Sequence, residues 1–391
     1  QAESVQDLIN YSGGDIDISD NAANLISAGD HVLNVTGVDV VTVNNGATSA
    51  SDGAILAGFT ADVEFDVVDD VVALKSVMGA DVAGELTEAN SITVDDGQGG
   101  QVVTASDGAI LAGFTADVEF DVVDDVVALK SVMGADVAGE LTEANSITVD
   151  DGQGGQVVTA SDGAILAGFT ADVAFDVTDD ANAVAAEVTG VGNGSGDLDE
   201  VNTLIVSGGD VDTAEAQAIQ SISGYDASAS DYEITDDVAA VISAGNSVIE
   251  NDGVTRVEVT DVADASEGVS LNNYSANVDF DVSDTAKAIA DNSGNLGKAD
   301  EVFVESGGDA VDVAEAQAIQ SISGYDASAS DYEITDTAAA VIGAGNSVLT
   351  NGNISVDVND GAVNASDGAI LAGFTADVDF DVSDTAANIA A

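Results

Sequence analysis

The chain has 391 residues, of which 73 are acidic and only 5 are basic, so its formal net charge is −68 at pH 7. Hydrophobic residues still make up 45% of the sequence and the acids are dispersed among them, which argues against a disordered acidic tail. Cysteine is absent, which excludes disulfides, thiolate catalysis and cysteine-type zinc sites, and scarce Lys and Arg argue against a nucleic-acid partner.

The N-terminal residues 1–14 precede the first regular pattern, and we expect them to form a lead-in segment. The sequence starts at Gln1 without a Met or a basic region, so we expect a signal peptide to be absent or already removed. Since no apolar run approaches 18 residues, we expect no membrane insertion.

A pattern of alternating acidic and apolar residues, closed by Asp, recurs eight times at spacings of 48 to 57 residues. Alternation with a period of two predicts a strand with one buried and one solvated face. In one copy, Val118, Phe120 and Val122 should face the core, while Glu119 and Asp121 face solvent. The eight copies of the pattern begin at Asp15, Glu64, Glu119, Ala174, Asp231, Asp279, Asp331 and Asp379.

An Ala- and Val-rich stretch with helical spacing follows each of these strands. After Asp124, for example, Val126, Val127 and Leu129 fit one face of a helix. The Asp that closes the strand stands where an N-cap is favoured, because its carboxylate can accept the free amides of the first turn. We therefore predict that Asp124 and its equivalents cap the helix that follows them.

A second, weaker set of strands lies between the copies, each followed by turn residues and a short helix such as "SDGAILAGF" or "TAEAQAIQSI". These intervening strands are predicted at 38–43, 91–94, 146–149, 204–206, 256–259, 302–304 and 354–358. Strands and helices then alternate about every 25 residues, which predicts parallel strands joined by right-handed crossovers.

The predicted fold is an α/β solenoid of parallel strands and short Ala-rich helices, with about 15 coils grouped in two-coil repeats of roughly 50 residues. Because the pattern does not change along the chain, we expect one continuous array over 1–391, either a segment of a longer chain or one unit of a polymer. Stacked coils of this kind would carry about one net charge per 1–2 Å, comparable to duplex DNA.

Such charge density requires screening by salt or bound cations, and Ca²⁺ is the divalent ion that prefers carboxylate oxygens. The best candidate ligands are the acid-x-x-Asp pairs that close the acidic strands. These pairs are Asp17 and Asp20, Asp66 and Asp69, Asp121 and Asp124, Asp176 and Asp179, Glu233 and Asp236, Asp281 and Asp284, Glu333 and Asp336, and Asp381 and Asp384. The alternative is a solvated acid followed by an N-cap, and the turns at 94–100 and 192–200 are other candidate calcium sites.

Catalytic constellations are poorly represented in the sequence. His31 is the only histidine, so a Ser-His-Asp or His-metal site would have to use it. Carboxylate pairs carry no information among 73 acids, and a polysaccharide lyase would lack its basic residues. We therefore do not expect an enzyme.

The phrases "DVSDTAANIAA" and "ASDGAILAGF" resemble the repeats of giant bacterial secreted and cell-surface proteins of the adhesin, surface-layer or filament type. The resemblance implies an extracellular, calcium-rich setting and a structural role. Open strand edges at the ends of a solenoid make copies of the chain itself expected partners, head-to-tail or lateral. The alternative is an adhesive module that recognises carbohydrate or a surface protein, for which Tyr225, Tyr274 and Tyr325 are the expected exposed aromatic residues.

Overall fold

The computed structural model describes most of the chain. The described residues are 16–77, 86, 89–95, 102–114, 118–133, 141, 144–150, 157–169, 173–189, 198 and 201–390. The predicted lead-in 1–14 and most of the two candidate calcium turns lie outside them. The chain forms two compact units: the first comprises 1–179, 190–204 and 222–224, and the second comprises 180–189, 205–221 and 225–391.

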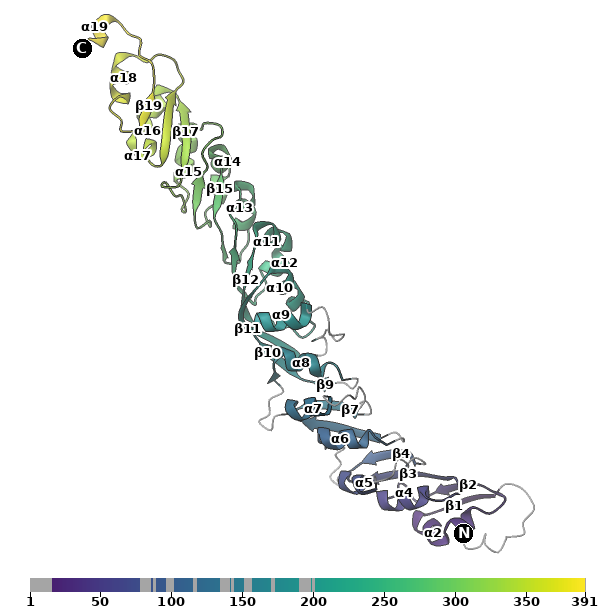
Figure 1. Cartoon of the computed structure of the whole chain (residues 1–391). Coiled ribbons are helices and arrows are strands. Elements are labelled where there is room, and N and C mark those ends of the chain that lie inside the picture. The colour runs from purple at the N-terminus through teal and green to yellow at the C-terminus, as the bar shows by residue number, and fades with distance from the viewer. Residues whose placement is uncertain are drawn as a thin grey trace. The chain divides into compact units, whose positions relative to one another are not determined.

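The first unit is a ladder of parallel strands that follow one another in chain order (Figure 1). The order is β1 (Ile16–Asp20), β2 (Val38–Val43), β3 (Val63–Asp69), β4 (Ala89–Val94), β6 (Val118–Asp124), β7 (Ala144–Val149) and β9 (Val173–Ala174). The short strand β5 (Val102–Val103) pairs with β6, and β8 (Val157–Val158) pairs with β10 (Asp176–Asp179).

Short helices follow the strands of the first unit. They are α2 (Ala22–Ala28), α3 (Asp30–Leu33), α4 (Ala50–Ala57), α5 (Val71–Val77), α6 (Ala105–Leu111), α7 (Val126–Met133) and α8 (Ala160–Leu166). Neighbouring helices along the chain contact one another from α4 to α8, so the helices stack in the same order as the strands. We use the word coil for one strand together with the helix that follows it.

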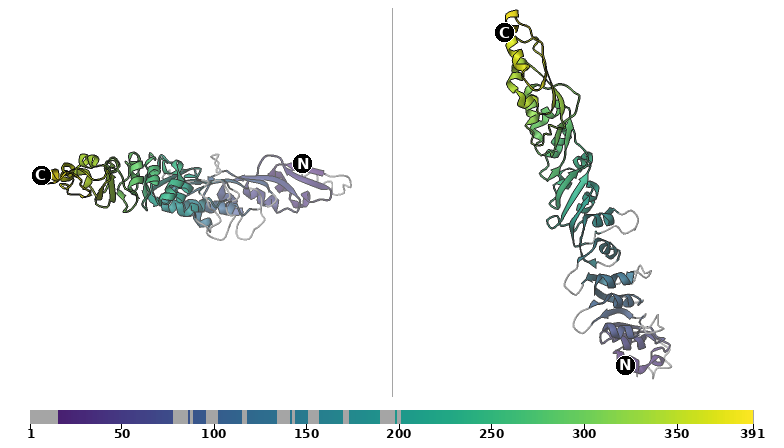
Figure 2. Two further views of the ribbon diagram at one scale, coloured as in Figure 1. Left: turned by 90° about the horizontal axis from the view of Figure 1, so that it is seen from above. Right: turned by 60° about the vertical axis from the view of Figure 1, so that its left-hand side comes forward.

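The second unit repeats this arrangement (Figure 2). Its strands are β11 (Thr203–Val211, which begins in the first unit), β12 (Asp231–Asp236), β13 (Val254–Val259), β14 (Val278–Asp279), β15 (Val282–Asp284), β16 (Val302–Val304), β17 (Asp331–Asp336), β18 (Asn353–Val358) and β19 (Asp377–Asp379). All of the strand pairs within the unit are parallel: β11 to β14 in order, β15 with β16, and β17 to β19 in order.

Helices again alternate with the strands of this unit. They are α9 (Ala181–Thr189), α10 (Thr213–Gln220), α11 (Val238–Ala244), α12 (Asn246–Ile249), α13 (Ala265–Asn272), α14 (Ala286–Asn292), the 3₁₀ turn η3 (Ser293–Asn295), α15 (Val313–Gln320), α16 (Ala338–Ala344), α17 (Asn346–Leu349), α18 (Ala365–Leu371) and α19 (Ala386–Ile389). The predicted α/β solenoid class, with parallel strands and short helices, is confirmed.

The two predicted kinds of strand are both present. We call β1, β3, β6, β9, β10, β12, β14, β15, β17 and β19 the acidic strands, and β2, β4, β7, β11, β13, β16 and β18 the intervening strands. Inward residues of the acidic strands form the core: Val118, Phe120 and Val122 are 3%, 0% and 0% exposed, as predicted. Glu119 is exposed and Asp121 is half-buried on the other face.

The helices lie close to the sheet because a glycine faces it. In α6, a Cβ atom added to Gly108 would lie 2.9 Å from a Leu141 methyl and 3.0 Å from Phe120 and Val122. A side chain at this position would force its neighbours to shift, so the glycine allows the helix to lie close to the sheet. Gly53, Gly163, Gly268 and Gly368 occupy the same place in α4, α8, α13 and α18.

The predicted N-caps are wrong by one residue. Asp125, not Asp124, accepts the third-residue amide of α7, from Ala128 at 2.8 Å. The same holds at α2, where Asn21 and not Asp20 is the cap. The Asp that closes the strand is the last residue of the strand, and its carboxylate does not accept the third-residue amide of the helix.

Candidate functional site: the acidic strand face and the links between coils

The carboxylate that closes each acidic strand joins two consecutive helices. In β6, Oδ2 of Asp124 lies 2.9 Å from the backbone nitrogen of Ala105, the first residue of the preceding helix α6. Its Oδ1 lies 2.9 Å from the backbone nitrogen of Asp125, the cap of the following helix. A first-turn amide has no partner within its own helix, and a carboxylate there also opposes the positive end of the helix dipole. One side chain therefore completes one helix and fixes the start of the next.

The same link recurs throughout the described residues. The accepting carboxylates and their donor amides are Asp69 and Ala50, Asp124 and Ala105, Asp179 and Ala160, Asp236 and Thr213, Asp284 and Ala265, Asp336 and Val313, and Asp384 and Ala365, at 2.9 to 3.1 Å. We call these residues the linking aspartates.

Helices that follow acidic strands are joined to the next coil in a similar way. The first-residue amides of α2, α11 and α16 donate to the side chains of Asn45, Asp261 and Asp360, at 3.2, 2.7 and 3.3 Å. Both kinds of coil can therefore be joined to the next by a side-chain oxygen at a helix N-terminus.

Hydrogen bonds from backbone amides and side chains lower the pKa of two aspartates at the starts of helices, Asp384 and Asp20. At Asp384, the amides of Thr385 and Ala365 and the Asn388 side chain hold the pKa of the carboxyl below its ordinary value. At Asp20, the Asn24 side chain and the Asn21 amide lower the pKa to about 2. Both groups therefore favour the charged state more strongly than a free aspartate does.

The predicted calcium pairs divide between two environments. The second members, Asp20, Asp69, Asp124, Asp179, Asp284 and Asp384, are half-buried, and all but Asp384 end a strand. The first members are exposed or half-buried: Asp17, Asp66, Asp121 and Asp176 lie within strands, whereas Asp281 and Asp381 lie outside β14, β15 and β19. Where the structure describes the chain, no group of three or more acidic, His or Cys side chains is placed to hold a metal ion.

Outward carboxylates on the acidic strands face hydroxyl groups on the intervening strands. Ser91 donates to Asp66 at 2.8 Å, and Ser146 donates to Asp121 at 2.7 Å. Thr93 stands beside Glu119 in the parallel register. This alternation places acids on successive acidic strands about 9–10 Å apart, twice the strand spacing and close to the Debye length at 0.1 M salt. The ladder thereby reduces its own charge repulsion.

The second unit breaks this alternation over β12, β13 and β14 and supplies a cation there. Acids on three adjacent strands, Glu233 on β12, Glu258 on β13 and Asp279 on β14, surround Arg256. The guanidinium lies 2.5 Å from Asp279, 2.9 Å from Glu258 and 3.3 Å from Glu233. These contacts raise the pKa of Arg256 above its ordinary value, and the hydrogen bond to Asp279 makes the largest contribution.

The three-strand ladder β17 to β19 has the same acids without the arginine. Glu333 is paired in register with Ser355, and Asp357 with Asp379. Ser355 on β18 therefore occupies the position that Arg256 has on β13. Ser355 is paired with Glu333 of β17, and Arg256 is paired with the equivalent Glu233 of β12.

Lysines also join helices of different coils. Lys75 on α5 pairs with Asp107 on α6, and Lys130 on α7 pairs with Asp162 on α8. Lys287 on α14 reaches Glu315 on α15 at 3.1 Å. Cationic side chains thus span the helical face of the stack as well as the strand face.

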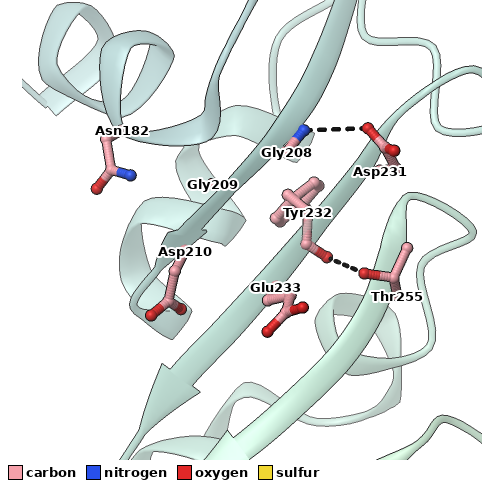
Figure 3. A pocket seen from close by; sticks show the side chains of 8 residues that line it. All are labelled: Asn182, Gly208, Gly209, Asp210, Asp231, Tyr232, Glu233 and Thr255. Atoms are coloured by element: carbon pink, nitrogen blue, oxygen red, sulfur yellow. Dashed lines mark hydrogen bonds between the residues drawn. The ribbon is translucent and has the colours of Figure 1, made fainter.

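A depression of about 500 Å³ lies on the strand face of the second unit. Asp210 and Glu233 stand in register on β11 and β12, and Gly208 donates its amide to Asp231 at 3.0 Å (Figure 3). Thr255 donates to the Tyr232 carbonyl at 3.0 Å. The lining offers carboxylates and backbone groups but no nucleophile with an adjacent base.

The aromatic residues expected on the surface are largely enclosed. Tyr274 is only 6% exposed and donates its hydroxyl to the Val241 carbonyl at 3.1 Å, so its predicted exposure is wrong. Tyr225 and Tyr325 are half-buried. The Tyr225 hydroxyl donates to Oδ1 of Asn251 at 3.0 Å, and the Tyr325 hydroxyl donates to the backbone carbonyl of Asn351 at 2.7 Å. His31 is exposed on the short helix α3.

Comparison with protein-family models gave no match to this chain, and comparison with curated protein sequences gave none either. Within the described ranges, no helix is both long enough and apolar enough to cross a membrane.

Proposed function

We propose that the chain is a structural repeat protein of an extracellular filament, surface layer or giant adhesin, and that it is not an enzyme. The observation that supports this most is the recurrence of the linking aspartate from coil to coil. A chain that uses the same carboxylate in the same role in coil after coil is organised around the joining of coils. Within each unit, such an array displays acidic side chains along its strand face.

The character of the acidic surface supports a scaffold rather than a reaction site. The outward acids recur along the acidic strands, and Asp66 and Asp121 accept hydrogen bonds from serine hydroxyls on the neighbouring strands. Catalytic carboxylates, in contrast, require a local environment that moves their pKa values apart. The resemblance of "DVSDTAANIAA" and "ASDGAILAGF" to surface repeat proteins agrees with an extracellular location.

We further propose that cations, Ca²⁺ among them, stabilise the array. The support is the net charge of −68, together with the use of the scarce basic side chains as bridges between strands and helices. The proposed cation ligands are the first members of the pairs, Asp17, Asp66, Asp121, Asp176, Asp281 and Asp381, of which Asp17, Asp66 and Asp381 are exposed.

Electron microscopy of the purified chain in calcium and salt tests the structural role. Filaments or a lattice are the expected result, whereas dispersed particles under every condition would contradict it. Circular dichroism during titration with a chelator at low salt tests the cation proposal. A lower melting temperature is expected, and an unchanged melting curve in excess chelator would refute it.

A further inference from the structure

Three side chains that join a helix to the next coil occupy the same place in the repeat, but one of them is an amide. Asn45, Asp261 and Asp360 each stand two residues after the end of an intervening strand, β2, β13 and β18 respectively. Each accepts the first-residue amide of a helix that begins 22 or 23 residues earlier. Asn45 is therefore the uncharged counterpart of two carboxylates.

Asn45 is followed by Gly46 in an exposed turn. Residues 44–47 are all exposed, and a Cβ atom added to Gly46 would meet nothing within 4 Å. Within the described part of the chain, the Gly46 amide donates no hydrogen bond. Because glycine has no side chain, its backbone nitrogen can approach the side chain of the residue before it closely. The Gly46 nitrogen is therefore a free and unshielded neighbour of the Asn45 carboxamide.

The hydrogen bond that Asn45 makes also activates its carboxamide. Oδ1 of Asn45 accepts the backbone amide of Ala22 at 3.2 Å. A donor held against a carbonyl oxygen stabilises the negative charge that develops on that oxygen when a nucleophile adds to the carbon. The Cγ atom of Asn45 is therefore the more electrophilic for its role in joining the coils.

We propose that Asn45 is a site of spontaneous modification, at which deamidation converts the amide into an aspartate. The backbone nitrogen of Gly46, after losing its proton to water, attacks Cγ of Asn45. The Cγ–Nδ2 bond breaks, ammonia leaves with a proton from water, and a five-membered succinimide remains. Water then adds to Cγ, the bond between Cγ and the Gly46 nitrogen breaks, and that nitrogen regains its proton. The net change consumes one water and releases one ammonia, and it is independent of the proposed function.

The fold already contains the product of this reaction at an equivalent position. Asp360 is followed by Gly361, whose φ of 82° is close to the 90° of Gly46, and its carboxylate accepts the Ala338 amide at 3.3 Å. An aspartate at position 45 would make the same contact with Ala22 as a charge-assisted hydrogen bond.

The contact with Ala22 also selects between the two possible products. Water that adds to the backbone carbonyl of the succinimide gives isoaspartate, whereas water that adds to Cγ gives aspartate. Because the Ala22 amide polarises the Cγ carbonyl, we expect aspartate to predominate in the folded chain.

The chain supplies a matched control in Asn351 and Gly352, the same dipeptide in a different environment. Both residues are half-buried, and a Cβ atom added to Gly352 would lie 2.9 Å from the Tyr325 hydroxyl. That hydroxyl donates to the Asn351 carbonyl at 2.7 Å, and the Asn351 amide donates to the Val348 carbonyl at 3.3 Å. These contacts hold the peptide unit that must rotate to close the ring, so Asn351 should react slowly while the chain is folded.

Peptide mass spectrometry of the incubated natural chain tests the site without any substitution. The folded chain is held at mildly alkaline pH, digested with pepsin in acid to stop the reaction, and sequenced by fragmentation to separate Asn44 from Asn45. Replacement of NH₂ by OH gives the mass change, the Asn45→Asp variant supplies the reference peptide for aspartate, and a methyltransferase specific for isoaspartate labels the other product. The same incubation in urea measures the rate at both dipeptides in the unfolded chain.

In the folded chain, Asn45 should convert several-fold faster than Asn351, with aspartate as the main product and a rate that rises with pH. In urea the two dipeptides should react at similar rates. An Asn45 that stays intact while the urea-treated chain reacts would overturn the site, as would equal rates at Asn45 and Asn351 in the folded chain. Isoaspartate as the main folded-state product would overturn the conversion of Asn45 into the carboxylate that Asp261 and Asp360 provide.

Discussion

The Oδ2 atom of Asp124 lies 2.9 Å from the amide nitrogen of Ala105, which starts a helix 19 residues earlier in the chain. This contact crosses from one coil to the one before it, so it depends on the stacking of coils and not on either helix alone. Since the same carboxylate also accepts the amide of Asp125, the stacking of strands and the placement of helices are fixed by one side chain.

Removing a linking aspartate should destabilise the ladder more than removing an outward acid. For Asp124→Ala, we expect a loss of about 1–2 kcal/mol, because two helix-terminal amides lose their acceptor. Asp121→Ala is the matched control, since its carboxylate contacts only a serine hydroxyl in the described structure. Chemical denaturation followed by circular dichroism measures the free energy of unfolding of both variants. Equal losses of stability in the two variants would contradict the linking role. Losses that are equal only when calcium is present would favour a metal site that the two aspartates share.

The close approach of helix and sheet predicts an unusual response to Gly→Ala substitution. Alanine normally favours a helix by up to about 1 kcal/mol over glycine. At Gly163, however, the new Cβ would lie 2.8 Å from a Val177 methyl and 3.0 Å from Leu198, so we expect a net loss of roughly 1–3 kcal/mol. Gly343→Ala in α16, where nothing lies within 4 Å, should be stabilising. Thermal melting of the two variants gives the comparison, and stabilisation by both would show that the helix is not held against the sheet.

The arginine bridge predicts reciprocal effects in the two equivalent ladders. Arg256→Ser should destabilise the chain at low salt, but only modestly, because the arginine side chain is 36% exposed and solvent screens its ion pairs. Ser355→Arg should stabilise it, since the new guanidinium would stand among Glu333, Asp357 and Asp379. Both effects should shrink as salt is raised. Melting temperatures that do not respond to either change at low salt would show that the outward acids do not repel one another appreciably.

Stability should pass through a maximum as the pH is lowered at low salt. Between pH 7 and about 5, partial protonation relieves repulsion among the acids and raises stability. The lowered pKa values of Asp20 and Asp384 act in the opposite direction. A carboxyl whose pKa is lower in the folded state contributes stability above about pH 4, and this contribution is lost as the pH falls through the lowered value.

Denaturation midpoints measured between pH 2 and 8 at two salt concentrations separate these effects. High salt should remove most of the rise toward pH 5 but leave the fall below pH 4, because the hydrogen-bonded carboxylates are less screened than the outward ones. Stability that continues to increase down to pH 2 would contradict a stabilising role for the ionised carboxylates of Asp20 and Asp384.

The strands and the fold class could be predicted from sequence because burial repeats every second residue. The pattern of Val118, Phe120 and Val122 is enough to assign a strand and its inward face, and the spacing of repeats then requires parallel coils. The strand predicted over 379–384 is only partly formed: β19 ends at Asp379, and within the described residues Val382 makes an isolated bridge to Val363.

The role of the closing aspartate could not be predicted from local patterns. Propensity rules place an Asp before a helix as its cap, and they cannot show that the next residue takes that role. The available signal was the constant separation of 19 residues between the first helical residue and the aspartate at 50 and 69, 105 and 124, 160 and 179, 265 and 284, and 365 and 384. A spacing conserved between repeats indicates contact, but its chemistry appears only when the coils are stacked.

Amide hydrogen exchange measured by NMR tests the links between coils most directly. First-turn amides of a helix normally exchange quickly because they have no partner in their own helix. We predict that the Ala105 amide is protected from exchange in the natural chain and loses this protection in the Asp124→Ala variant. The Ala160 amide, which donates to Asp179, should stay protected in both. An Ala105 amide that exchanges in the natural chain as fast as an unbonded first-turn amide would contradict the account.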